Sequence, residues 1–311
     1  EQVPGFLIVT GTNGGERGLG AATENVLIDG ERIANKSTDA RTALARIAAS
    51  EVAYIDIVDG AGLNVPGLTG QVANIVLVAG GGSGGFKTTV RWQPELRPRL
   101  DDNWLNGEIS TTGKLGGTNV TLSLKNEARR QGHWGPESRF DGDGDLLFIR
   151  DEIGRYNADQ PRLSAALART TANGNKWNFN LGGQLINLDE QVHGTSIQPG
   201  AGAVREAFRF TEEERNFDIG GDYELGLGKG RLKLIGLYRF EHSPAVDSFI
   251  VDQEVGGRSG ERFKQTADES EAILRSEYSW RTAGGTDWQV AIEGAYNMLD
   301  VDAELAEVQP D

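Results

Sequence analysis

The sequence predicts a mainly β protein, in which a small mixed α/β domain is followed by about nine antiparallel strands. Three observations favour this fold class. Glycine is abundant at 43 residues against 9 prolines, and 38% of residues are apolar, as in folded chains with many turns. Apolar and polar residues alternate in many segments after residue 86, and Gly-rich turns recur there at regular intervals.

Composition excludes several classes of function. The net charge of −15 opposes binding to nucleic acid, because phosphate recognition needs a basic surface. The absence of cysteine removes disulfides, thiol catalysis and Cys-ligated zinc. Apolar runs such as 75–79 are far shorter than the roughly 20 residues of a membrane-spanning helix.

The first eighty residues have the signals of a small mixed domain. The pair Asp29-Gly30 lies between two short apolar runs and favours a hairpin turn. Ser37, Thr38 and Asp39 are good N-caps for a following amphipathic segment. We therefore expect a hairpin over 26–33, a short helix over 40–50, and strands over 52–58 and 71–79. The Gly-rich segment between the two strands lacks the lysine of a phosphate-binding loop.

Five motifs in order resemble the plug domain of TonB-dependent outer-membrane receptors: VPGF (3–6), ERGLG (16–20), ENVLIDGERI (24–33), ALARIAASEVAYIDIVDG (43–60) and GLTGQVANIVLV (67–78). The resemblance implies a plug over 1–79, a Gly-rich linker over 80–85, and the N-terminal part of a transmembrane β-barrel over 86–311. In this family the plug fills a barrel of about 22 strands.

The family's N-terminal TonB box and its C-terminal aromatic strand have no counterpart in this sequence. We therefore expect a chain that is truncated at both ends, with an incomplete barrel that forms an open, curved sheet. By resemblance, Arg17 in ERGLG makes polar contacts between plug and barrel wall; the alternative is a surface arginine beside a Gly turn.

Alternation alone does not separate a barrel from a soluble β-sandwich. Turn spacing is more informative: the turns near Gly116, Gly174, Gly228 and Gly284 are separated by 58, 54 and 56 residues. Outer-membrane barrels alternate such tight turns with long outer loops in this way. We expect those loops over 131–158, 190–205 and 243–268, with a further one after Leu299.

The strands that remain are expected near 86–93, 103–113, 118–130, 160–172, 176–189, 206–227, 230–242, 269–283 and 286–299. Trp177, Trp280 and Trp288 lie beside the tight turns, whereas Tyr238 and Tyr296 lie toward the other strand ends. Barrels place aromatic residues at both membrane interfaces, although ordinary core aromatics are the alternative.

Two sets of residues are candidate ligand sites. His133, His193 and His242 lie at or beyond the outer strand ends, where imidazoles are candidate contacts for a metal chelate; polar loop residues are the alternative. Asp141, Asp143, Asp145 and Glu152 follow the spacing of a calcium loop, but Leu146 stands where that loop needs glycine, and an acidic loop is the alternative. No catalytic motif, and no cofactor, is predicted.

The resemblance implies a receptor and importer in the bacterial outer membrane. Its partners are the lipid bilayer, a scarce bulky nutrient (siderophore, cobalamin or oligosaccharide), and TonB with its inner-membrane energising complex. The alternative function is a soluble or surface-exposed β-protein that only binds a carbohydrate or an adhesion ligand. We do not expect an enzyme.

Overall fold

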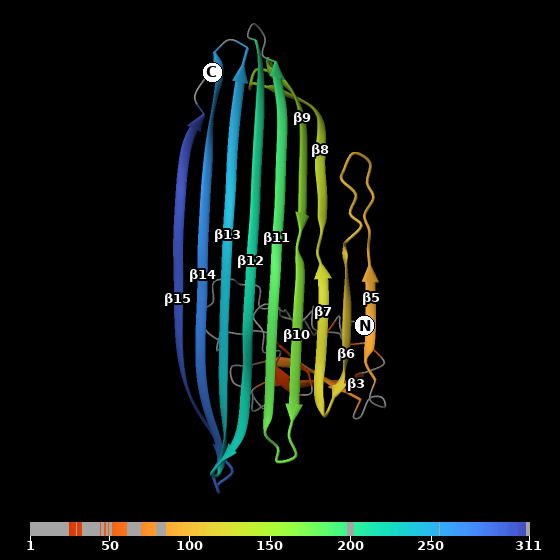
Figure 1. Cartoon of the computed structure of the whole chain (residues 1–311), viewed down its shortest axis with the longest axis vertical. Coiled ribbons are helices and arrows are strands. Elements are labelled where there is room, and N and C mark those ends of the chain that lie inside the picture. Colours follow the sequence, from red (N-terminus) through yellow and green to blue (C-terminus); the bar gives the residue numbers. More distant parts are fainter. Residues whose placement is uncertain are drawn as a thin grey trace.

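The protein is mainly β and consists of two sheets (Figure 1). The computed structural model describes residues 25–28, 30–32, 44, 47, 49, 52–60, 70–78, 85–197, 202–254 and 256–308. Within these residues, no helix has the length and apolar character needed to cross a membrane.

The N-terminal sheet has four strands in the order β2-β1-β4-β3: β1 Val26–Ile28, β2 Glu31–Arg32, β3 Val52–Asp59 and β4 Gln71–Leu77. The predicted hairpin is confirmed, since β1 pairs antiparallel with β2 around Gly30, whose φ of 79° suits the turn. The two longer predicted strands are confirmed as β3 and β4, which pair antiparallel, while β1 lies parallel to β4.

Buried aliphatic side chains hold this sheet together. Val26, Ala73 and Ile75 form one cluster, against which Leu44, Val52 and Ile57 pack. The predicted helix over 40–50 lies largely outside the described residues. Within it, the Ile47 amide donates a hydrogen bond of 3.0 Å to the Leu44 carbonyl, which forms a single turn. The α part of the expected mixed domain is therefore not seen in the described residues.

The second sheet contains eleven strands, and every pairing in it is antiparallel. The strands are β5 Lys87–Trp92, β6 Gly107–Leu115, β7 Thr118–Asn126, β8 Arg129–Phe140, β9 Leu146–Asp159, β10 Pro161–Thr170, β11 Lys176–Ile197, β12 Ala203–Leu227, β13 Gly230–Gln253, β14 Gly257–Arg281 and β15 Asp287–Val308.

These eleven strands run as nine, because β8 continues β7 and β9 continues β10. Pairing of β7 with β10 stops at Asn126 opposite Pro161 and resumes between β8 and β9 at Arg129 opposite Ala158. Each side advances by three residues, so the register does not change. Strand β11 likewise pairs first with β10 and then with β9 in one register. The order is β15-β14-β13-β12-β11-β10-β7-β6-β5. In the view of Figure 1, β9 lies above β10 and β8 lies above β7.

All four predicted glycine turns are confirmed, and they gather at one end of the sheet, which we call the short-turn end (Figure 1). Leu115 pairs with Thr118 across Gly116 and Gly117, whose φ angles of 56° and 82° match a two-residue hairpin turn. The other turns contain Gly174, Gly228 and Gly285, each with positive φ.

The prediction of long loops at the opposite end, which we call the far end, is wrong. Segment 131–158 forms most of β8 and β9. Residues 190–197 complete β11 and 203–205 begin β12, while residues 243–253 complete β13 and 257–268 begin β14. The residues that follow Leu299 continue β15 to Val308. The described turns that remain there are short, such as 141–145. Both faces of these segments carry polar residues, so the sequence does not show the alternation of apolar and polar residues that predicts a strand. Backbone pairing nevertheless continues, because it does not depend on the polarity of the side chains.

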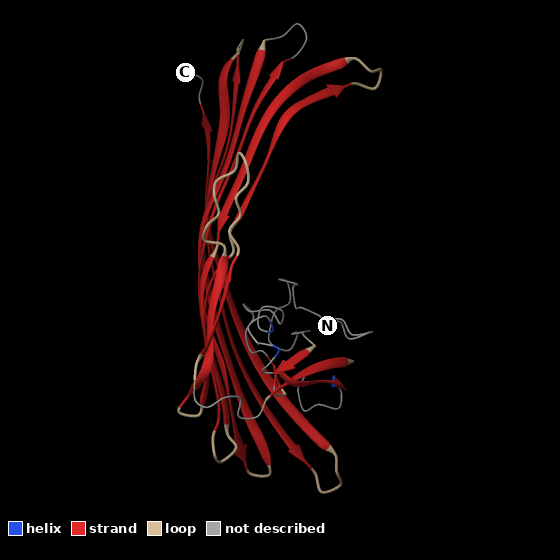
Figure 2. Ribbon diagram, turned by 90° about the vertical axis from the view of Figure 1, so that its right-hand side faces the viewer, coloured by secondary structure: helices blue, strands red, loops and turns tan. Residues whose placement is uncertain are grey.

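Figure 2 shows that the large sheet is open and curved, with the small sheet on its concave side nearer the short-turn end. Its lateral edges are β5 and β15, so the expectation of an open, curved sheet is confirmed. The free edge of β8 is covered by loop 93–106. In that loop the Asn103 side chain donates to the Ala128 carbonyl (3.1 Å), and Arg99 stacks over Trp134 with 5.0 Å to the ring centroid.

The turn between β14 and β15 offers a matched test of backbone strain. Gly284 and Gly285 both have space for a Cβ, but only Gly285 has a positive φ, of 85°. We expect Gly285→Val to destabilise the fold by about 1–2 kcal/mol and Gly284→Val to have little effect. Denaturant titration followed by the fluorescence of the adjacent Trp280 and Trp288 measures both, and equal effects would contradict the assigned turn geometry.

Candidate functional site

An apolar band crosses one face of the large sheet from β5 to β15. Because directly paired residues share a face, the register defines its rows. One row reads Val90, Ile109, Leu124, Leu163, Gly183, Phe217, Phe240, Ser270 and Met298. Side chains of this row are exposed, such as Val90 at 67% and Leu163 at 63%, and so are Leu274 at 74% and Ile292 at 75% in other rows of the band. The band is therefore apolar, and none of the residues that the structure describes covers it.

The band has sharp limits along the strands. On β15 it extends from Trp288 to Met298, and the next residue on that face is Asp300. The row that contains Asp300 also holds Arg215, His242 and Asp268, with His242 Nδ1 2.6 Å from Asp268 Oδ1. At the short-turn end, Trp280 and Trp288 stack with ring centroids 6.3 Å apart. Aromatic residues and charged residues thus border the band.

The opposite face of the same strand segments is mostly polar, apart from Ile235, Leu237 and Ile273, and its charged side chains are paired. Arg162 Nη2 lies 2.6 Å from Asp218 Oδ1, and their side chains are only 14% and 7% exposed. Asp222 accepts from Asn178 at 3.1 Å and lies 3.4 Å from Lys233 Nζ. Further pairs join Arg91 to Glu108 and Arg275 to Glu293. The charges on this face therefore have partners at short range.

This polar face is the concave one. Its side chains include most of the buried polar residues, namely Ser110, Ser123, Ser164, Asp218, Asp222 and Glu277, because side chains converge on the inside of a curved sheet. The apolar band is correspondingly on the convex face. Gly182 lies beneath the Arg162–Asp218 pair, and a Cβ there would be 2.4 Å from an atom of each partner. This glycine makes the close pair possible.

On the concave face toward the far end, a chain of charged groups crosses β8, β9 and β12. His133 Nε2 lies 2.7 Å from Glu152, Arg150 lies 2.7 Å from Glu152, and Arg150 lies 3.2 Å from Glu206. Two glycines make room for it. A Cβ on Gly154 would be 2.1 Å from the His133 ring, and a Cβ on Gly194 would be 2.6 Å from Arg150 Nε.

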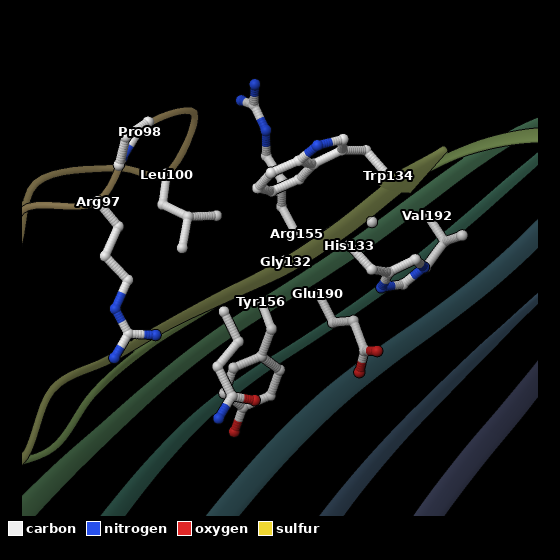
Figure 3. A pocket seen from close by; sticks show the side chains of 12 residues that line it. Arg97, Pro98, Leu100, Gly132, His133, Trp134, Arg155, Tyr156, Glu190 and Val192 are labelled. Atoms are coloured by element: carbon white, nitrogen blue, oxygen red, sulfur yellow. The ribbon is translucent and has the colours of Figure 1, made fainter. Parts of the chain in front are cut away.

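A shallow open depression adjoins this chain of charges (Figure 3). His133, Tyr156, Glu190 and Val192 line it from the sheet, and Arg97, Pro98 and Leu100 line it from loop 93–106. In Figure 3, Trp134 and Arg155 project together to one side of the ribbon, while Tyr156 and Glu190 project to the other. The depression thus lies around the edge strand β8, and its polar groups reach the concave face.

The three histidines proposed as chelate contacts do not converge. His193 and His242 occupy convex positions on β11 and β13, whereas His133 is on the concave face and pairs with Glu152. Within the described part of the chain, no group of three or more His, Asp or Glu side chains is arranged to hold a metal ion. His133 is therefore the one histidine of the three beside the concave depression.

The proposed calcium ligands are also separated. Asp141, Asp143 and Asp145 belong to the turn between β8 and β9, where Asp141 Oδ1 accepts the amides of Asp143 and Asp145 at 3.0 and 2.9 Å. Glu152 is on β9 and is engaged by His133 and Arg150. The Asp141 carboxylate stabilises the turn itself. Arg17 lies outside the described residues.

The sequence interpretation missed the paired charges of the concave face. Asp218 and Asp222 alternate with the apolar residues of β12, which signals a polar inner face, but their partners come from other strands. Comparison with protein-family models and with curated proteins finds no match to this chain.

Gly182 and Gly183 are adjacent and face opposite sides, which makes a matched pair. Gly182→Val places methyl groups within the Arg162–Asp218 contact, whereas a Cβ at Gly183 meets no atom closer than 4.0 Å. We expect Gly182→Val to lower the free energy of unfolding by about 2 kcal/mol, and Gly183→Val to change it little. Denaturant titration of both variants measures the difference, and a larger loss at Gly183 would refute the face assignment.

Proposed function

We propose that the chain is part of an outer-membrane receptor and importer of the TonB-dependent class, with the convex band in contact with lipid. The observation that carries this proposal is the inverted polarity of the sheet: its apolar face is exposed, and its polar, charge-paired face is on the inside. A water-soluble sheet buries its apolar face instead. A transmembrane barrel needs the polarity found here.

The dimensions of the band support this assignment. A membrane-spanning strand needs about 9–11 residues, and on β15 the band extends from Trp288 to Met298. Tryptophans border it at the short-turn end, and Tyr238 and Tyr296 occupy one row near its other limit. Aromatic residues favour the two membrane interfaces because the ring can be buried while its polar atom stays hydrated.

The two ends of the sheet support an orientation. Short turns face the periplasm in outer-membrane barrels, so the far end would project from the cell. The small sheet is on the concave side nearer the short-turn end (Figure 2), where a plug would lie inside a completed barrel. In this proposal the far concave face captures a nutrient, and TonB, with its energising complex, moves the plug to open a path. No covalent step is involved.

The alternative function is a soluble or surface-exposed β-protein that only binds a carbohydrate or an adhesion ligand. Such a protein requires another layer over the convex band, because an apolar surface of this extent is unfavourable in water. Fractionation of cells that express the full-length gene product tests the two. We expect it in the outer-membrane fraction, released by detergent and not by high salt or carbonate; a product that stays in solution without detergent overturns the proposal.

A charge in the centre of the band is a sharper test. Leu274 lies mid-band on β14, and Thr266 lies on the same strand and face beyond the band. For a lipid-facing position we expect Leu274→Arg to cost about 2–4 kcal/mol and Thr266→Arg to cost about 0–1 kcal/mol. Refolding of the full-length protein into bilayers at graded denaturant concentrations measures both costs. Equal, small costs would indicate that the band faces water.

A further inference from the structure

The concave face changes character beyond the limit of the apolar band. There, four phenylalanines gather on three adjacent strands. Phe208 on β12 pairs directly with Phe249 on β13, while Phe210 and Phe263 flank Asp247 in the next row. These positions share the face of Asp218, because the register between the strands does not change. Phe249 and Phe263 are exposed, at 44% and 39%, and we call the four residues together the phenylalanine platform.

Carboxylates surround this platform. Eight occupy concave positions on β11 to β14 beyond the band: Glu190, Glu206, Glu212, Glu214, Glu241, Asp247, Glu261 and Glu269. In the described parts of these same segments, every lysine and arginine occupies a convex position: Arg205, Arg209, Arg215, Arg258, Arg262 and Lys264. Charge is thus separated by face, and the platform lies within a surface of one sign.

Cations contact this acidic surface from its borders. Arg150 on β9 lies 3.2 Å from Glu206, and Arg239, at the level of the band, pairs with Glu241. Burial, opposed by a hydrogen bond from Asn216 and reinforced by Glu241 and Glu212, raises the pKa of Glu214. The carboxylates therefore act on one another, as expected where negative potential accumulates.

We propose that the far concave face binds an organic cation with an apolar or aromatic body, and that this cation is the cargo class of the importer. The phenylalanine rings pack against the apolar body and attract its positive charge through their faces. The surrounding carboxylates raise the local concentration of cations and repel anions. The inference rests on the proposed transport function, because it assigns the cargo to the side of the sheet that would line the barrel.

Two dyes with the same ring system and opposite charge test this inference. Rhodamine 6G is a cation and fluorescein is an anion, and both have a flat xanthene body. We expect the full-length protein, held in lipid nanodiscs of neutral lipid, to bind rhodamine 6G at least about tenfold more tightly than fluorescein at low salt. Fluorescence anisotropy measures both affinities, with empty nanodiscs as the reference for dye that partitions into lipid.

Matched variants locate the site. We expect Phe249→Ala to weaken binding of rhodamine 6G about tenfold, and the neighbouring convex variant Ile250→Ala to leave it unchanged. The combined variant Asp247→Asn and Glu261→Gln keeps side-chain shape and should remove the preference for the cation, whereas Asp252→Asn on the convex face should not. Unchanged electrophoretic heat-modifiability of each variant confirms that the fold is retained.

The outcomes separate this inference from the proposed function. A membrane-extracted protein that binds both dyes equally, prefers fluorescein or binds neither overturns the cationic cargo alone. A cation preference that survives both the Phe249→Ala and the Asp247→Asn/Glu261→Gln changes also overturns it, because binding would then lie elsewhere. A protein that fractionates as soluble overturns the transport function whatever the dyes do.

Discussion

The antiparallel register of the large sheet is the constraint on which the other features depend, and it is constant except for one irregularity between Arg139 and Phe140 at the end of β8. Side chains alternate between faces with a period of two, so a slip by one residue would move every apolar side chain of a strand to the other face. The breaks at 127–128 and at Gln160 do not cause such a slip, since paired strands advance equally across them. The exposed band, the paired charges and the phenylalanine platform are all consequences of this continuity.

The parts of the fold that were predictable are those with a local signal. Gly116 and Gly285 supply conformations that turns require, and the large apolar residues of β11 and β15 lie at every second position within the band. The far halves of the strands were not predictable, because both faces there carry polar residues. These residues are in strands because their backbones pair with neighbouring strands, as where Arg209 on β12 pairs with Ser248 on β13. Such backbone pairing does not produce a repeating pattern of residue types in the sequence.

The candidate site was less predictable than the fold. His133, His193 and His242 share a position near strand ends, but only the register shows that His133 faces the side opposite to the other two. The Arg162–Asp218 contact joins residues 56 positions apart, and a local pattern does not specify such a partner. Phe208 and Phe217 both lie on β12, but on opposite faces of the sheet. The large apolar side chains therefore move from one face to the other along this strand. A single alternation of apolar and polar residues, assumed for the whole of β12, does not detect this change of face.

The contrast between the two halves of the concave face has a physical explanation under the proposed function. Level with the band, lipid on the convex side lowers the local dielectric constant, so a lone charge is costly, and Arg162 and Asp218 are paired at close range. Beyond the band, water would bathe both faces and hydrate the carboxylates. A surface of one sign, such as that around Asp247, is then tolerated although cations contact it only at its borders. The same hydration would leave its charge available to a ligand, so under the proposed function the height of the membrane would determine where along the strands a charge-selective surface is stable.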